Sequence, residues 1–132
     1  MFLSRLNANE KNVFLSLAMH AAQANGVVEA EEYTMIQEYC KEMGVAFFDA
    51  RNIRPFDEVA SFFQNTDQTV KRIVILEIIG LMNADGTYDD QEREFVKTLA
   101  RMIDVSEESV ERMNELIDRY LNLVREMVTE IG

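Results

Sequence analysis

The chain has 132 residues, of which 48% are hydrophobic, and these values are typical of one globular domain. Its formal net charge is −11 at pH 7, from 24 acidic and 13 basic residues. Such a surface repels phosphate backbones and anionic lipids, so it argues against nucleic-acid binding and membrane insertion and favours a cation or a basic protein as partner. The single Cys40 excludes an internal disulfide, and residues 1–9 contain no apolar signal segment, so we expect a cytoplasmic protein.

The first two predicted helices have clear sequence boundaries. Asn7, with Glu10 three residues later, is a predicted capping pair for a helix that runs to about Ala24. A second helix is predicted from about Glu29 to Gly44. The residues expected on its buried side are Tyr33, Ile36, Tyr39, Cys40 and Met43.

The middle of the chain holds a short helix and then a central one. Pro55 is suited to the first position of a helix covering about residues 56–64. Thr66 or Asp67 then caps a helix over residues 67–84, which is apolar on almost every side and must lie inside the protein. We expect Ile75, Ile78 and Ile79 of this helix in the core.

Two further helices are predicted after the central one. One covers residues 89–103, and Ser106 caps the last, with Glu107 and Glu108 in its first turn. Methionines on the last helix suit either the core or a groove for a partner. Its apolar residues recur every three or four positions, at Val110, Met113, Ile117, Tyr120, Val124 and Met127 or Val128. No segment alternates like a strand, so residues 1–132 are predicted to form a single all-α domain.

The chain also repeats itself with an offset of 60 residues. The two copies, at about residues 10–45 and 70–105, each form a helix–turn–helix unit, and two such units packed together make a pseudo-symmetric bundle. The turns align as Ala24-Asn25-Gly26-Val27-Val28-Glu29 with Ala84-Asp85-Gly86-Thr87-Tyr88-Asp89, and Glu32 aligns with Glu92.

These two turns, together with residues 57–63 and 99–102, resemble the tellurite-resistance TerB-like family over about residues 10–112. The resemblance implies a bundle of about seven helices and a role in stress response through cation binding at the acidic turns. The first turn departs from the pattern, because Asn25 stands where the family has an acid and Val28 offers no cap.

The second turn is the stronger candidate for a cation site. Asp85, Thr87, Asp89 and Glu92 can supply several oxygens around one glycine, as a hard divalent cation such as Ca²⁺ requires. An EF-hand would need a ligand at Leu81, so a weak, partly hydrated site is expected, with Tyr88 pointing inward. The corresponding residues of the first turn are Asn25, Glu29 and Glu32.

The same acidic residues also have a purely structural interpretation. Asp89 and Glu92 have the spacing of a capping box, and Asp85 is suited to an Asx turn over Gly86. The sole histidine, His20, is interpreted as a partly buried or surface residue, because a general base needs a positioned partner. Cys40 is interpreted as a small core residue.

The sequence therefore predicts a non-enzymatic cytoplasmic accessory or stress-response module that binds a divalent cation, Ca²⁺ above all, through its acidic turns. One alternative is an acidic protein-interaction module that docks a basic partner without metal. Another is an enzyme that uses the paired carboxylates for acid–base work. No phosphate-binding loop, organic-cofactor motif or nucleophile–base pair is present to favour the enzyme.

Overall fold

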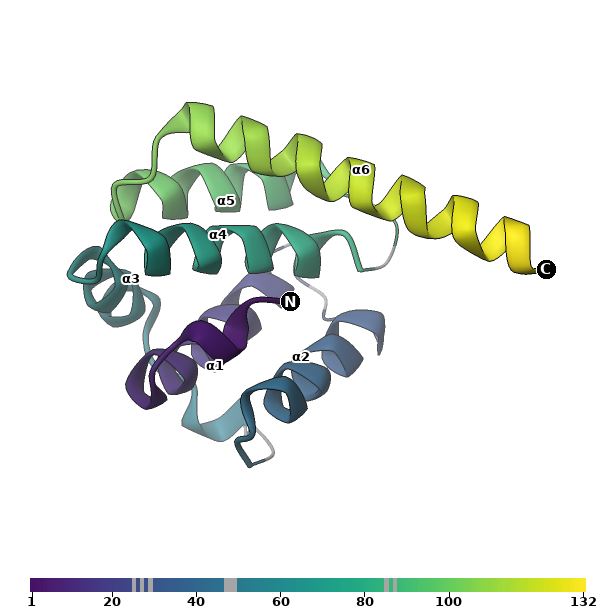
Figure 1. Cartoon of the computed structure of the whole chain (residues 1–132). Coiled ribbons are helices and arrows are strands. Elements are labelled where there is room, and N and C mark those ends of the chain that lie inside the picture. Colours follow the sequence, from purple (N-terminus) through teal and green to yellow (C-terminus); the bar gives the residue numbers. More distant parts are fainter. Residues whose placement is uncertain (25, 27, 29, 47–49, 85, 87) are drawn as a thin grey trace.

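The structure is a computed structural model that describes every residue except 25, 27, 29, 47–49, 85 and 87. Its described residues form α-helices and 3-10 helices and contain no β-strand, which confirms the predicted all-α class. The elements are η1 (Leu3–Arg5), α1 (Ala8–Ala22), α2 (Ala30–Met43), η2 (Ala50–Asn52), α3 (Phe56–Gln64), α4 (Gln68–Met82), α5 (Asp90–Met102) and α6 (Glu107–Ile131) (Figure 1).

Six of these described elements are α-helices, whereas the family resemblance implied about seven. Between the end of α2 and Pro55, the described residues contain only the short 3-10 helix η2. The proline ring disfavours helical backbone at Arg54, the residue that precedes it, and this helps to keep the segment from becoming an α-helix. Pro55 itself is the N-cap of α3 rather than its first residue.

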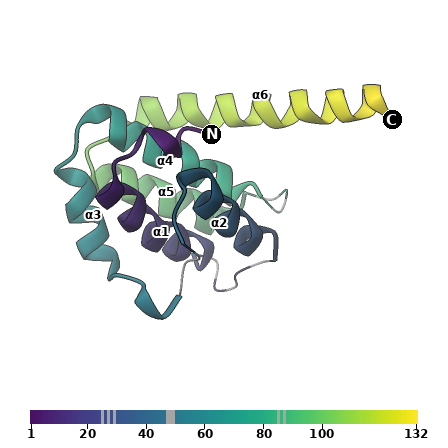
Figure 2. The ribbon, with the colours of Figure 1, turned by 60° about the horizontal axis from the view of Figure 1, so that its bottom comes forward.

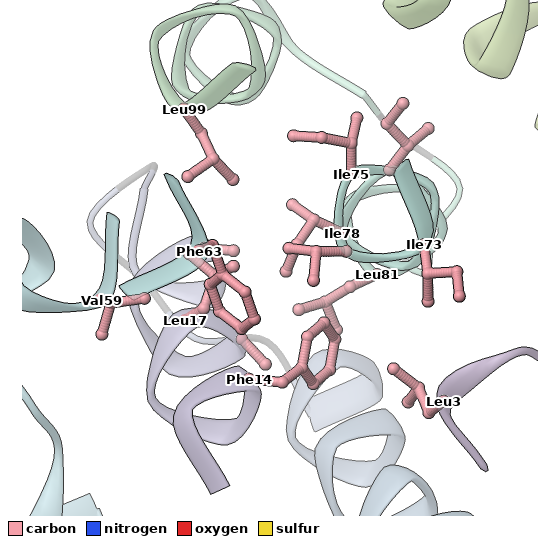
Figure 3. Packing of buried hydrophobic residues seen from close by; sticks show 14 of the residues in the cluster. Leu3, Phe14, Leu17, Val59, Phe63, Ile73, Ile75, Ile78, Leu81 and Leu99 are labelled. Atoms are coloured by element: carbon pink, nitrogen blue, oxygen red, sulfur yellow. The ribbon is translucent and has the colours of Figure 1, made fainter. Parts of the chain in front are cut away.

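Helix α4 is the centre of the bundle and contacts each of the other five α-helices. Ile75, Ile78 and Ile79 are each 0% exposed, which confirms the predicted burial of this helix. Figure 3 shows Ile75 and Ile78 among side chains from other helices, including Phe63 of α3. The apolar stretch in the sequence is thus buried by neighbours on several sides.

The bounds of two helices repeat with the offset seen in the sequence. Helices α1 and α4 begin and end 60 residues apart, at Ala8–Ala22 and Gln68–Met82. Their N-caps are Asn7, whose side chain accepts a hydrogen bond from the Glu10 amide, and Asp67, which accepts one from the Val70 amide. Asp67 is therefore the cap of α4, one of the two residues predicted for that role.

One prediction about helix α2 is wrong. Tyr33 is 43% exposed, although the sequence pattern placed it on the buried side. The buried face begins instead at Glu32, one turn before Ile36, and both residues are at most 1% exposed. A carboxylate in the first helical turn is stabilised by the free amides there, and this allows a charged side chain to lie on the buried face of α2.

Helix α6 extends beyond the rest of the molecule. Val110, Met113 and Ile117 are buried, but Tyr120 and Met127 are 48% and 51% exposed although they continue the same pattern. Figures 1 and 2 both show the C-terminal part of α6 projecting past the other helices. In the part of the chain that is described, no helix has the length and apolarity to cross a bilayer.

Candidate functional site

The second acidic turn connects α4 to α5 and is held by backbone hydrogen bonds. The Ala84 amide donates to the Leu81 carbonyl at 3.0 Å, and the Gly86 amide donates to the Asn83 carbonyl at 3.1 Å. Gly86 has a φ of 83°, in the left-handed region that glycine adopts without strain. The glycine therefore lets the chain reverse directly after α4.

Asp89 and Glu92 form a reciprocal capping box at the start of α5. The Glu92 amide donates to Oδ1 of Asp89 at 2.8 Å, and the Asp89 amide donates to Oε1 of Glu92 at 3.1 Å. This confirms the capping interpretation of the pair. Asp89 is exposed, whereas Glu92 is only 1% exposed. Glu92 thus already bonds the backbone of the turn from a buried position.

The predicted cation ligands of this turn are only partly placed. Asp85 and Thr87 lie outside the described residues, so the structure locates Asp89 and Glu92 alone. Within the described part of the chain, no three His, Cys, Asp or Glu side chains are grouped so that they could hold a metal ion. A cation at this turn would therefore need oxygen atoms from Asp85 and Thr87 in addition to the exposed Asp89 carboxylate.

The first turn has the same layout but a different chemical composition. Gly26 has a φ of 89°, and its amide donates to the Gln23 carbonyl at 2.9 Å, as Gly86 does to Asn83. Of the ligands predicted here, Asn25 and Glu29 lie outside the described residues. Glu32, the third, is 1% exposed and is the third residue of α2, just as Glu92 is the third residue of α5.

Tyr88 borders the second turn and packs against the core, in agreement with its predicted inward orientation. The Arg93 guanidinium lies over its ring, with Cζ 4.2 Å from the ring centroid, in a cation–π contact. Burial raises the pKa of the Tyr88 hydroxyl to about 12, although the neighbouring Arg93 lowers it somewhat. The tyrosine therefore joins the turn to α5 in its neutral form.

A buried carboxylate that sequence reasoning missed lies at the N-terminal segment. Glu77 of α4 is 3% exposed, and its Oε1 accepts a hydrogen bond from the Phe2 amide at 2.7 Å and lies 3.0 Å from the Met1 amine. Burial opposes the charge of that amine, but hydrogen bonds from it to Glu42 and Glu77 outweigh this effect and raise its pKa. Phe2 and Glu77 are 75 positions apart in the chain, so no local sequence pattern predicts their contact.

His20 and Cys40, the remaining side chains that could be reactive, take part in packing the helices together. The Nε2 atom of His20 lies 2.7 Å from the Arg54 carbonyl, and its ring lies edge-on to Phe56 at 5.7 Å. Since a carbonyl only accepts, that nitrogen carries a proton and donates it. His20 therefore links α1 to the start of α3. Cys40 is buried, with 4% of its surface exposed, as predicted.

The chain was compared with protein families, curated proteins and solved structures. No match was found in any of the three. The resemblance to the TerB-like family therefore rests on the residues of the two turns and their neighbours in the sequence.

Proposed function

We propose that this protein is a non-enzymatic interaction module whose acidic surface docks a basic protein partner. The observation that carries the proposal is an acidic face on the first half of α6. Five carboxylates in residues 107–118 are exposed, and the only basic residue in this stretch is Arg112, which pairs with Glu115 at 3.3 Å. The members of this acidic face are Glu107, Glu108, Glu111, Glu115 and Asp118.

Two observations, one on this face and one on the capping pair of α5, support a basic partner over a small substrate. A row of carboxylates on a rigid helix gives a fixed negative potential that attracts and orients a positive surface. Catalysis by paired carboxylates, in contrast, requires that both reach the reacting atoms. Glu92 is 1% exposed and bonds the turn backbone, so the pair at the start of α5 is suited to structural support.

The experiment is a binding titration with a lysine- and arginine-rich peptide as probe. The test variant is Glu111→Gln with Glu115→Gln on the acidic face. The matched control is Glu31→Gln with Glu38→Gln on α2, where Glu38 pairs with Lys41 at 3.3 Å much as Glu115 pairs with Arg112. Both double variants change the net charge equally.

We expect the α6 variant to bind about threefold to tenfold more weakly than wild type and the α2 variant to change little, since each rim charge contributes under about 1 kcal/mol. Equal losses in both variants would mean that only net charge attracts the peptide. That result would contradict a defined docking face.

Cation binding at the second turn is a second candidate function. It is supported by Asp89, which is exposed and uses only Oδ1 in the capping box, next to the acidic sequence at residues 85–87. Ca²⁺ suits these oxygen donors, and the small number of charges predicts weak affinity. The test compares calcium binding by wild type and Asp89→Asn.

We also propose that the chain is a TerB-like, cytoplasmic stress-response protein. The support is the pair of Ala-Asn-Gly and Ala-Asp-Gly turns, each followed by a buried glutamate, Glu32 or Glu92. Survival of cells on tellurite with and without the chain tests this assignment. Equal survival would argue against it.

A further inference from the structure

The second half of α6 presents apolar side chains to solvent where the rest of the bundle does not reach. We call residues 119–131 the distal segment. Figures 1 and 2 show it extending away from the other helices. Five of its apolar side chains are largely exposed: Tyr120 at 48%, Leu123 at 53%, Met127 at 51%, Val128 at 57% and Ile131 at 84%.

A partner that covers its apolar side chains would stabilise this segment as a helix. A helix of about a dozen residues without tertiary packing is marginally stable in water, because its stability comes chiefly from burying an apolar face. A contiguous apolar patch on an exposed helix also marks an interaction surface. Within this segment Leu121 packs against the core, but the five side chains named above stay largely exposed among the described residues.

The spacing of the apolar residues indicates that the partner is another helix. Along α6 they alternate in steps of three and four, which is the seven-residue repeat of coiled coils. The first three lie in the core of the bundle, and Tyr120, Met127 and Ile131 continue the same line into solvent, with Val124 partly buried between them. The positions are Val110, Met113, Ile117, Tyr120, Val124, Met127 and Ile131.

We propose that the distal segment pairs antiparallel with the same segment of a second copy of this chain. The distal segment carries Arg119 and Arg125 in its first part and Glu126 and Glu130 in its second, with no net charge. An antiparallel pair places the basic part of one helix beside the acidic part of the other. It also keeps the two bundles at opposite ends of the helix pair. This limits the repulsion between two chains that each carry a net charge of −11.

Other occupants fit the distal segment less well. A basic peptide is attracted by net negative charge, which this segment lacks and the acidic face of residues 107–118 has. A membrane surface is bound by helices with an excess of Lys and Arg on the polar face, and an acidic bundle is repelled by anionic lipids. Pairing with a second copy of this chain requires neither a net negative charge nor an excess of Lys and Arg on the segment.

Antiparallel heptads define the register of the pair. In it, Tyr120 faces Ile131 of the partner subunit, and Val124 faces Met127 of the partner subunit. The end of each helix then lies near a groove of about 750 Å³ on the other bundle, lined in part by Met35, Tyr39 and Tyr120. The groove and the distal segment share Tyr120 and form one continuous surface.

The surface available predicts a weak dimer. Half-exposed side chains of this size each offer on the order of 50 Å², so two copies bury roughly 500 Å² of apolar surface. With a polar rim of the usual proportion and the groove, the interface approaches about 1,000 Å², the lower limit for a specific complex. We therefore expect dissociation constants on the order of micromolar.

The test is sedimentation equilibrium of the full chain at about 100 µM, well above the expected dissociation constant. Wild type should be dimeric, and Met127→Glu should weaken the dimer by at least about a hundredfold, because it places a charge opposite Val124 of the partner subunit in an apolar contact. The matched control is Tyr33→Glu, which makes the same charge change at an exposed apolar residue of α2 and should leave the dimer intact. Leu123→Glu, next to Val124 on the edge of the line of contacts, serves as a second variant.

Two further measurements separate this proposal from the docking of a basic partner, on which it does not depend. The dimer should persist in about 0.5 M salt, where charge contacts are screened, and hydrogen exchange over residues 119–131 should slow as wild-type concentration rises. Wild type that stays monomeric at about 100 µM, or Met127→Glu that dimerises as well as Tyr33→Glu, would overturn the proposal. So would a monomer that binds phosphatidylcholine vesicles through this segment.

Discussion

Glu32 and Glu92 occupy the same position in two helices, the third residue of α2 and of α5, and each is only 1% exposed. They stand 60 residues apart in the chain and follow the two turns that the sequence repeat aligns. Their shared burial indicates that the acidic turns stabilise helix starts. The acidic face of α6 is exposed, so it is better suited to binding than the acidic turns are.

The first prediction concerns the capping role of Glu92. Glu92→Ala should lower the free energy of unfolding by about 1–2 kcal/mol, because it removes the side chain that accepts the Asp89 amide. Glu92→Gln should keep most of the stability, since its amide oxygen also accepts. Urea denaturation measures both, with the exposed Glu94→Ala as control, expected to change stability by less than about 0.5 kcal/mol. A Glu92→Ala effect no larger than that of Glu94→Ala would refute the capping role.

The second prediction concerns calcium at the second turn. If the turn binds Ca²⁺, wild type should titrate calorimetrically with dissociation constants on the order of 10⁻⁴–10⁻³ M. Asp89→Asn should lose about tenfold in affinity while keeping the helix cap, because asparagine caps as well as aspartate. Asp57→Asn in the first turn of α3 is the control and should bind as wild type does. Identical heats from all three proteins would show that the turn caps α5 and does not bind calcium.

The third prediction compares the ends of α2 and α5. Gly44 and Asp104, again 60 residues apart, have φ of 68° and 63°, in the left-handed region that costs a side chain about 1 kcal/mol. Asp104→Gly should therefore stabilise the protein by roughly 0.5–1 kcal/mol, and Gly44→Ala should destabilise it by a similar amount. Thermal unfolding of both variants checks the pair. Changes of the same sign would show that backbone strain does not decide stability here.

The fourth prediction concerns the centre of the core. Ile78 is 0% exposed in α4, so Ile78→Ala should cost about 2–5 kcal/mol through lost burial and the cavity left behind. The free energy of unfolding from urea curves gives the value. A cost below about 0.5 kcal/mol, typical of surface sites, is incompatible with the packing around α4.

The fifth prediction concerns pH. The pKa of Tyr88 is raised to about 12 in the folded protein, above its ordinary value near 10. The neutral tyrosine therefore contributes its stability fully below pH about 10, and this contribution is lost as pH rises toward about 12. Stability of wild type should fall more steeply over that range than stability of Tyr88→Phe. Parallel curves would show that Tyr88 ionises freely in the fold.

Much of the fold follows from local patterns in the sequence. The bounds of α3, the cap at Asp67 and the capping box of Asp89 with Glu92 were all predictable, because each depends on residues a few positions apart. Tyr33 was misplaced because hydrophobic periodicity assigns an apolar residue to the core, whereas at the start of α2 the buried side chain is the carboxylate Glu32 and Tyr33 is exposed.

Contacts between residues far apart in the chain could not be predicted from the sequence. Glu77 receives the N-terminal segment, and no spacing rule connects residues that far apart. The apolar repeat of α6 also looks the same where it lies in the bundle, at Ile117, and where it lies in solvent, at Met127. Periodicity predicts that a helix face is covered but does not say whether its own fold or another molecule covers it.

The central claim, docking of a basic partner on α6, is tested most directly by mapping the bound peptide. Nuclear magnetic resonance shifts of the backbone amides should be recorded while the lysine- and arginine-rich peptide is titrated into the full chain. We expect the largest changes on residues 107–118, where Glu111 and Glu115 are exposed. Changes spread evenly over the exposed carboxylates of every helix, or largest on α2 around Glu31 and Glu38, would contradict it.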